Sequence, residues 1–520
     1  MKHLLALLAA AGIMSVMAEM ERATPESQGV PSEAIMRLLD AFGEAYGEYP
    51  DQPGRPKGGP HGIVIVRHGK VIAEGSWKPF DTLNETHMLY SHSKTFTATA
   101  IGFLAEEGKL DLDERVVDIF DAETPTNACE NLRMLRVRDL LTMNCGGKKA
   151  HSIEDGGDWV RNFLTSEFPK APGCEFRYDS DATYMLAVIV ERRSGEKLMD
   201  YLGRRLFSRI GIEKAWTTTS PQGIACGGWG MNMTTREIAR FGQFLLQRGR
   251  WNGEYLINPL WIDLMTARHT VSGWKNVGIK ALGEGSDWEQ GYGFQCWRCT
   301  QGGAYRCDGS AGQYTLVFPE ADMVVSIHAG SNQGQLTLDL VYRHLLSAVR
   351  GEPLAENQEA CAALERRLAT LAIAPMRGTF EGVERFLDVD YEFADPHDRG
   401  FKSVRLAKNA EGGVVLKFRT RGGESEVRLG SGEWTPGVMT IDPERYEWLG
   451  ALIGRLAVKS SAGMRQPGEF VARIYFTGGT HYLDFTFCEE NGRRVVHLRM
   501  FGMSGRKFEG VECAGASAAR

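Results

Sequence analysis

Ser91 and Lys94 stand three residues apart at the beginning of a segment with strong helical periodicity, residues 91–107. At this spacing both side chains lie on one face of a helix, one turn apart. The positive end of the helix favours a developing oxyanion, and a lysine whose pKa is lowered by burial can take the proton of a nearby hydroxyl. The pair therefore predicts a nucleophilic serine with an adjacent base. For the Ser-x-x-Lys pattern alone, an N-cap serine beside an exposed lysine is the alternative.

The wider context favours the catalytic interpretation. Residues 89–116 resemble the active-site helix of the serine β-lactamase and penicillin-binding protein superfamily, closest to the class C branch and its esterase and amide-hydrolase relatives. Further segments resemble the family in the same order along the chain, and together they cover about residues 25–350. These segments are 61–77, 137–146, 227–242, 291–294 and 312–320.

The second motif of this family, Tyr-x-Asn or Tyr-x-Ser, corresponds to Tyr178-Asp179-Ser180. The resemblance implies that Tyr178 lies near Lys94, acts as a general base for Ser91 and later protonates the leaving group. A core tyrosine is the alternative. Ser180 is expected to bind substrate, but it replaces an asparagine that orients the substrate amide in β-lactamases. This replacement argues against β-lactam hydrolysis.

The third motif, Lys, His or Trp followed by x-Gly, has two candidates. His328-Ala329-Gly330 matches the letters, whereas Cys307-Asp308-Gly309 matches the position before Ser310. We favour the positional match, which makes His328 a strand-end residue and leaves a simple turn as the alternative for Asp308 and Gly309.

This match implies that Asp308 and Gly309 bind substrate and that the backbone N–H groups of Ser91 and Ser310 form the oxyanion hole. In the family, a cation at position 307 binds the carboxylate of β-lactams and of acyl-D-Ala-D-Ala. Here only Arg298 and Arg306 are candidate substitutes. Aromatic residues that fit either a pocket wall or the core are Trp229, Tyr292 and Trp297.

The implied function is an exported serine hydrolase that forms an acyl-enzyme at Ser91. Its substrate would be a small molecule or peptide, either a carboxylic ester or an amide, D-amino-acid peptides included. No metal and no organic cofactor is expected. A β-lactamase or a D-Ala-D-Ala carboxypeptidase is the alternative within the class. A catalytically inactive module that binds cell-wall peptide or β-lactam is the alternative outside it, and the intact Ser91, Lys94 and Tyr178 argue against it.

Hydrophobic periodicity predicts the elements that must position these residues. Two strands at 62–66 and 71–77 form a hairpin, and strands return at 313–318 and 323–328. Helices are expected at 30–47, 91–107, 135–142, 181–194, 197–205, 234–248, 258–267 and 335–348. This order predicts one α+β unit whose sheet is assembled from both ends of the segment. The resemblance implies a β-lactamase/transpeptidase-like fold, an antiparallel sheet flanked by helices plus a helical subdomain.

The pattern changes after about residue 355, where a helical segment at 357–372 leads into strand-like runs separated by Gly and Asn turns. The runs are 402–407, 413–419, 424–429, 437–441, 470–476, 481–487 and 494–501. Short strands with regular turns predict an antiparallel sandwich or barrel. We therefore expect a domain at 19–355 and a smaller all-β domain at 356–520.

Residues 1–18 read as a signal peptide, with a basic start at Lys2, an apolar run and a small-residue cleavage site ending at Ala18. The mature protein is then expected in the periplasm or the medium. Beyond this segment no apolar run reaches the length of a membrane span. The 520 residues, 43% of them hydrophobic and with a net charge of −6, suit a globular protein that does not bind nucleic acid. The sequence leaves the oligomeric state open.

All ten cysteines lie after the predicted signal peptide, so disulfides are compatible with export. The closely spaced Cys296, Cys299 and Cys307 lack a fourth ligand from a second Cys-x-x-Cys or a His pair. A local disulfide or free thiols are therefore favoured there over a zinc site.

Overall fold

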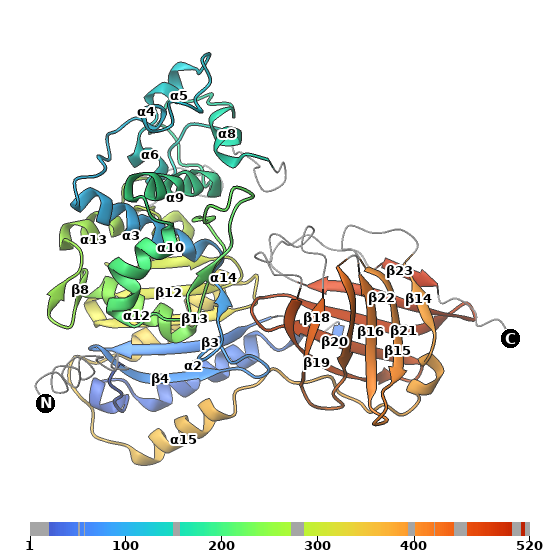
Figure 1. Ribbon diagram of the computed structural model, residues 1–520. Coiled ribbons are helices and arrows are strands. Elements are labelled where there is room, and N and C mark those ends of the chain that lie inside the picture. Colours follow the sequence, from blue (N-terminus) through green and yellow to red (C-terminus); the bar gives the residue numbers. More distant parts are fainter. Residues whose placement is uncertain are drawn as a thin grey trace, which may run out of the picture.

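The computed structural model describes residues 20–49, 52–56, 58–148, 157–271, 285–393, 401–420, 422–440, 455–501 and 511–514. The predicted signal peptide at 1–18 lies outside the described residues. Figure 1 shows two parts side by side, a layered unit of helices and sheet and a C-terminal unit built of strands. In the described ranges, no helix has both the length and the apolar character that crossing a membrane would require.

A six-stranded antiparallel sheet forms the centre of the first unit, in the order β10-β11-β12-β13-β3-β4. Its strands come from the two ends of the unit, because β13 pairs with β3. The strands are β3 (Pro60–Arg67), β4 (Lys70–Ser76), β10 (Trp297–Arg298), β11 (Tyr305–Gly309), β12 (Gln313–Phe318) and β13 (Met323–Ala329). The prediction of a sheet assembled from both ends is confirmed.

Both faces of this sheet are buried, which explains the unbroken apolar run in β3. Ile63 and Ile65 belong to the core on one face, and Val64 and Val66 belong to the core on the other. Helices α2 (Ser32–Ala45), α14 (Gly334–Leu340) and α15 (Gln358–Ala369) contribute to the first core.

Helix α12 (Thr235–Leu246) covers the other face, where Gly242 lets it lie directly on the sheet. A Cβ at Gly242 would lie 2.5 Å from a methyl carbon of Thr315 and 2.6 Å from one of Val324. Helices α3 (Ser93–Glu106) and α9 (Ser180–Ser194) pack against each other in the same core. That contact brings two distant segments of the sequence together.

Further helices form a subdomain beyond α3 and α9 (Figure 1). Its helices are α4 (Val116–Ile119), α5 (Glu130–Met134), α6 (Val137–Leu141) and α8 (Trp159–Leu164). The rest of the unit holds α10 (Leu198–Leu202), α11 (Ser208–Ile210), α13 (Pro259–Thr266) and the short strands β1 (Glu48–Tyr49), β2 (Gln52–Pro56), β5 (His87–Met88), β6 (Trp216–Thr217), β7 (Met231–Met233), β8 (Arg250–Trp251) and β9 (Glu254–Tyr255). An antiparallel sheet flanked by helices with a helical subdomain is the α+β arrangement that the sequence predicts.

Two antiparallel sheets make up the C-terminal unit and share one apolar core. Strand β17 lies beside β18, and β14 lies beside β23, so the two sheets close around that core. The strands are β14 (Asp390–Glu392), β15 (Phe401–Lys408), β16 (Val414–Thr420), β17 (Gly423–Arg428), β18 (Thr435–Thr440), β19 (Arg455–Gln466), β20 (Glu469–Phe476), β21 (Tyr482–Glu490), β22 (Arg493–Phe501) and β23 (Val511–Ala514). The all-β expectation is confirmed, although β14, β19 and β23 were not predicted.

The two units touch through specific contacts. The structure places α15, which the predicted boundary at residue 355 assigns to the second unit, against α2 and β4 of the first. Phe80 of the first unit packs edge-on against Tyr475 of β20, with 5.4 Å between ring centroids. The turn between β20 and β21 reaches the segment that precedes Ser91, where the Met88 N–H donates to the Gly478 carbonyl at 3.0 Å.

Candidate active site

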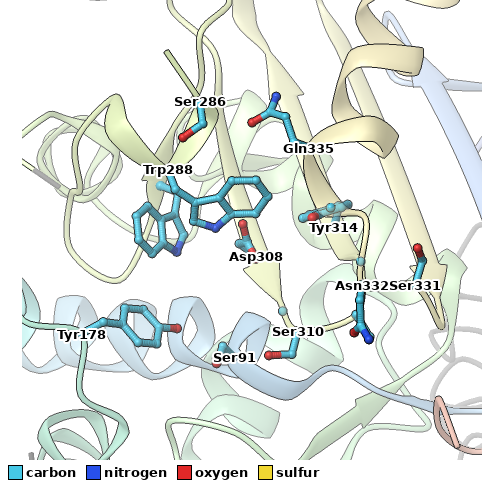
Figure 2. Close-up of a pocket in the computed structure, with 15 residues that line it drawn as sticks. Ser91, Tyr178, Ser286, Trp288, Asp308, Ser310, Tyr314, Ser331, Asn332 and Gln335 are labelled. Carbon is cyan, nitrogen blue, oxygen red and sulfur yellow. The ribbon is translucent and has the colours of Figure 1, made fainter. Parts of the chain in front are cut away.

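Ser91 lies in a single 3₁₀ turn, Tyr90–His92, directly before helix α3. The residue before it, Tyr90, has φ of 49°, a left-handed conformation that a bulky residue rarely adopts. The Ser93 hydroxyl holds this bend by donating to the Tyr90 carbonyl at 2.6 Å. In turn the Met231 N–H donates to the Ser93 oxygen at 3.1 Å. The bend thereby directs the Ser91 side chain away from the core and into a pocket (Figure 2).

Lys94 is buried beneath Ser91, with 1% of its surface exposed. Its ammonium donates to the Ser91 hydroxyl at 3.2 Å, to the Ser180 hydroxyl at 3.0 Å and to the Gly228 carbonyl. Three acceptors match the three donors of an ammonium group. Lys94 is therefore held in one position, within proton-transfer distance of the Ser91 oxygen.

The Gly228 carbonyl reaches Lys94 because the chain there runs against α9. A Cβ at Gly228 would lie 2.8 Å from the Ser180 carbonyl oxygen. Ser180 itself contacts Lys94 and is not among the described residues that line the pocket. The structure thus places the predicted substrate-binding serine on the lysine instead.

Tyr178 lies beside this pair, with the Lys94 ammonium 4.9 Å from its ring centroid. The ring stacks on Trp297, with 5.7 Å between centroids. Burial raises the pKa of the Tyr178 phenol, and a hydrogen bond with Ser91 acts in the opposite direction without cancelling that rise. The phenol is therefore neutral near pH 7 and can act as a proton donor.

Strand β11 runs past the segment that carries Ser91, and Gly309 is the point of closest approach. A Cβ there would lie 2.1 Å from the Leu89 carbonyl oxygen, so only glycine fits. Gly309 and Ser310 both line the pocket with Ser91. Figure 2 shows Ser310 next to Ser91 at the end of this strand, which is the placement expected of two amides that share an oxyanion.

Asp308 lines the same pocket, one residue before Gly309. Its Oδ2 accepts a hydrogen bond from the Arg306 Nε at 2.8 Å, and the two side chains are 10% and 0% exposed, respectively. Burial raises the pKa of the Asp308 carboxyl, and the Arg306 guanidinium acts against that rise.

Neither arginine that the sequence suggested as a substitute cation lines the pocket. Arg306 is buried behind Asp308, where its Nη1 donates to the Arg298 carbonyl at 2.8 Å. Arg298 donates from its own Nη1 to the Thr266 carbonyl. Cys307, the first residue of the motif, is fully buried and contacts Thr95 of α3.

The pocket has a volume of about 420 Å³ and holds polar and aromatic groups that the sequence did not single out. Trp297 lines it as one of the proposed wall residues, whereas Trp229 and Tyr292 do not. The lining residues are Ser91, Tyr178, Ser286, Trp288, Trp297, Asp308, Gly309, Ser310, Ala311, Gly312, Tyr314, Ser331, Asn332, Gly334 and Gln335. Trp288 had no motif to mark it, because it stands in a short 3₁₀ helix, Asp287–Glu289, before β10.

The alternative third motif lies elsewhere. His328 is fully buried on β13, 2.9 Å from the Thr235 hydroxyl, and stacks on His87 with 4.8 Å between ring centroids. It does not line the pocket. The geometry agrees with the positional choice of residues 307–309.

One group of possible metal ligands lies outside the pocket. In the part of the chain that the structure describes, Cys488, Glu490 and His497 on β21 and β22 are the one set whose donor atoms lie close enough to share an ion. Cys296, Cys299 and Cys307 form no such set, and the nine described cysteines are free thiols. Neither group lines the pocket beside Ser91.

Comparison with known proteins relates the first unit of the chain to a known family. A family model described as Beta-lactamase matches residues 61–348. A 6-aminohexanoate-dimer hydrolase from Paenarthrobacter ureafaciens is 25% identical over 285 residues, which cover 51% of this chain and 70% of that protein. A D-aminopeptidase from Brucella anthropi is 28% identical over 171 residues, 30% of this chain and only 32% of that protein. Among solved structures, an octameric penicillin-binding protein homologue from Pyrococcus abyssi is similar with a TM-score of 0.46 at 14% identity, covering 93% of this chain and 99% of that one.

Proposed function

Because the chain belongs to the beta-lactamase family, whose curated members similar to it are hydrolases, we propose that it is a serine hydrolase acting through an acyl-enzyme at Ser91. The observation that carries this proposal is the 3.2 Å contact between the Lys94 ammonium nitrogen and the Ser91 hydroxyl, at the edge of a pocket. A contact between lysine and serine that served only to stabilise the fold would not require a pocket beside the serine.

In the first step the Ser91 oxygen attacks a carbonyl carbon, and its proton passes to the Lys94 nitrogen. Lys94 takes part in this step as the amine, with its lone pair toward the Ser91 hydroxyl and its two N–H groups toward Ser180 and the Gly228 carbonyl. The carbonyl oxygen becomes an oxyanion, which the N–H groups of Ser91 and Ser310 stabilise. The tight packing of Gly309 on Leu89 supports this role, because it fixes the two backbone segments relative to each other.

In the second step the bond to the leaving group breaks, and the neutral Tyr178 phenol gives that group a proton. The proton held by Lys94 then restores the phenol, so the pair returns to its starting state. Water then attacks the carbonyl carbon of the acyl-enzyme and gives one proton to the pair formed by Lys94 and Tyr178. This pair returns the proton to the Ser91 oxygen as the acid is released. The hydrogen bond between Tyr178 and Ser91 and the position of the Tyr178 ring beside Lys94 support its assignment as the donor.

The substrate class is a carboxylic ester or an amide. The two curated relatives are named as a 6-aminohexanoate-dimer hydrolase and a D-aminopeptidase, and both names support a substrate built from amino-acid units. We propose that the enzyme is exported to the periplasm or the medium, and the basic start at Lys2 with the apolar run after it supports this proposal.

Intact-protein mass spectrometry tests this proposal. The mature chain, residues 19–520, is exposed briefly and separately to a penicillin, an activated acetate ester and a D-Ala-D-Ala peptide. We expect a covalent adduct with the ester that is absent in Ser91→Ala. Absence of any adduct and of any turnover would instead favour the inactive binding module. A stable penicillin adduct would identify a penicillin-binding branch.

A further inference from the structure

The charge in the pocket beside Ser91 is unusual for a site that would hold an acidic substrate. Among the described lining residues, Asp308 is the one carboxylate, and none is a lysine, an arginine or a histidine. Two cations lie close to the lining: Lys94 lies below Ser91 with all three donor positions occupied, and Arg306 is fully buried behind Asp308. A negatively charged ligand group would therefore meet a carboxylate and no free cation.

One oxygen of Asp308 is available to a ligand. Oδ2 accepts from the Arg306 Nε, whereas Oδ1 accepts no hydrogen bond from any residue in the described ranges. Arg306 is fully buried and lies behind the carboxylate, so it fixes the orientation of Asp308 without reaching the pocket. Because Asp308 lines the pocket, its Oδ1 is the oxygen that a bound ligand can contact.

Aromatic rings surround this carboxylate. Trp288, Trp297, Tyr314 and Tyr178 all line the pocket with Asp308. Figure 2 shows Asp308 between Trp288 and the end of β11, above Ser91. The Arg306 guanidinium already lies 4.7 Å from the Trp288 ring centroid and 5.7 Å from that of Trp297, so these indoles are packed around a positive charge. Ring faces together with a carboxylate are the groups that bind ammonium ions.

We propose that this pocket accepts substrates that carry an ammonium group, primary or methylated, which contacts Asp308 Oδ1 and the indoles of Trp288 and Trp297. The proposal rests on the proposed function in naming the substrate class of that same site. It also predicts that a carboxylate-bearing ligand such as a β-lactam binds poorly in this pocket. The competing explanation is that Asp308 only neutralises Arg306.

A binding experiment on the full mature Ser91→Ala chain separates these explanations, because it needs no acyl transfer. The probes are n-hexylamine, n-hexanol and n-hexanoate, which share one chain and differ in charge. Binding is followed by tryptophan fluorescence, to which Trp288 and Trp297 contribute, and by calorimetry. We expect the ammonium to bind about tenfold more tightly than the alcohol, and the carboxylate to bind most weakly.

Asp308→Asn should remove this preference. Asp484→Asn is the matched control, because Asp484 pairs with the buried Arg473 in the C-terminal unit with the same 10% side-chain exposure and does not line this pocket. If Asp308→Asn does not fold, the affinities of the three probes for the Ser91→Ala chain still show whether the pocket prefers an ammonium group. Equal affinity for the amine and the alcohol would refute the proposal, as would a preference that persists in a folded Asp308→Asn variant. A failure of acyl-enzyme formation would count against Ser91 catalysis alone.

Discussion

The Thr480 hydroxyl oxygen lies 2.9 Å from the phenol oxygen of Tyr90, the residue directly before Ser91. Thr480 belongs to the turn between β20 and β21, 390 residues along the chain from Tyr90. Both groups are buried, and burial raises the pKa of the Tyr90 phenol to about 12. The C-terminal unit therefore holds the strained bend that carries the proposed nucleophile.

Replacing Thr480 by Val should slow acylation without unfolding the protein. Loss of one buried hydrogen bond costs about 1–3 kcal/mol when its partner is left unsatisfied, and we expect acylation to fall about tenfold through a lower kcat with little change in KM. The measurement is the rate of acyl-enzyme formation against substrate concentration. Thr477→Val is the control, because Thr477 lies in the same turn but bonds the Ala457 carbonyl instead. Equal rates in both variants would show that Thr480 has no positioning role.

Removal of the Tyr178 hydroxyl should affect chemistry more than stability. We expect Tyr178→Phe to lower kcat/KM by about 10²- to 10⁴-fold, the range typical of a lost general acid or base. The ring still stacks on Trp297, so the melting temperature should change little. Tyr184→Phe is the matched control, since its phenol is also buried but bonds Ser220. Activity that survives in Tyr178→Phe would assign the proton transfers to Lys94 alone.

Buried histidines should make the protein sensitive to acid. Burial lowers the pKa of His92 and His481 to about 3 and that of His87 to about 4. The unfolded chain then binds protons below about pH 6.5 while the folded chain does not, so stability is full above pH 6.5 and falls as the pH falls. One such histidine lowers the free energy of unfolding by about 2–3 kcal/mol between pH 6.5 and 4.5.

His92 tests this most cleanly, because its two ring nitrogens have no hydrogen-bond partner among the described residues and it stacks on Phe96. We expect His92→Phe to reduce the loss of stability between pH 7 and 4.5, as measured by denaturant unfolding at each pH. His68→Gln, at an exposed position, provides the control. Identical pH dependence in His92→Phe and the parent would mean that His92 is not kept neutral by burial.

Gly309 should not tolerate a side chain. A Cβ at this position would lie 2.1 Å from the Leu89 carbonyl oxygen, far inside van der Waals distance, so Gly309→Ala must push β11 away from the Ser91 segment. We expect a destabilisation of about 1–3 kcal/mol and a loss of acylation of at least tenfold. Gly302→Ala is the control, because its nearest neighbour is the Glu320 carboxylate at 3.6 Å. Thermal unfolding and acylation rates are measured for both variants. Equal stability and equal acylation rates in the two would contradict the prediction.

The sequence determined the features that depend on local periodicity and on motif spacing. The helix from Ser93 to Glu106 and the strand at 60–67 follow from apolar residues at helical spacing and from an apolar run bounded by turns. Because Ser91 and Lys94 are three residues apart, their side chains lie on the same side of a helical turn wherever that turn stands in the fold. Strand β19 was not predicted because Ser460, Ser461 and Gly463 break its apolar pattern, and pairing with β18 and β20 supplies its order instead.

Only the tertiary structure decided which charged and aromatic side chains line the pocket. The register of β11 turns Cys307 into the core and Asp308 toward Ser91, and a one-residue slip would exchange them. Trp288 reaches the site because the buried Asp287 beside it accepts hydrogen bonds from Gln335 and Tyr342. These contacts join residues far apart in the sequence, and their energies depend on burial and geometry that no local pattern encodes.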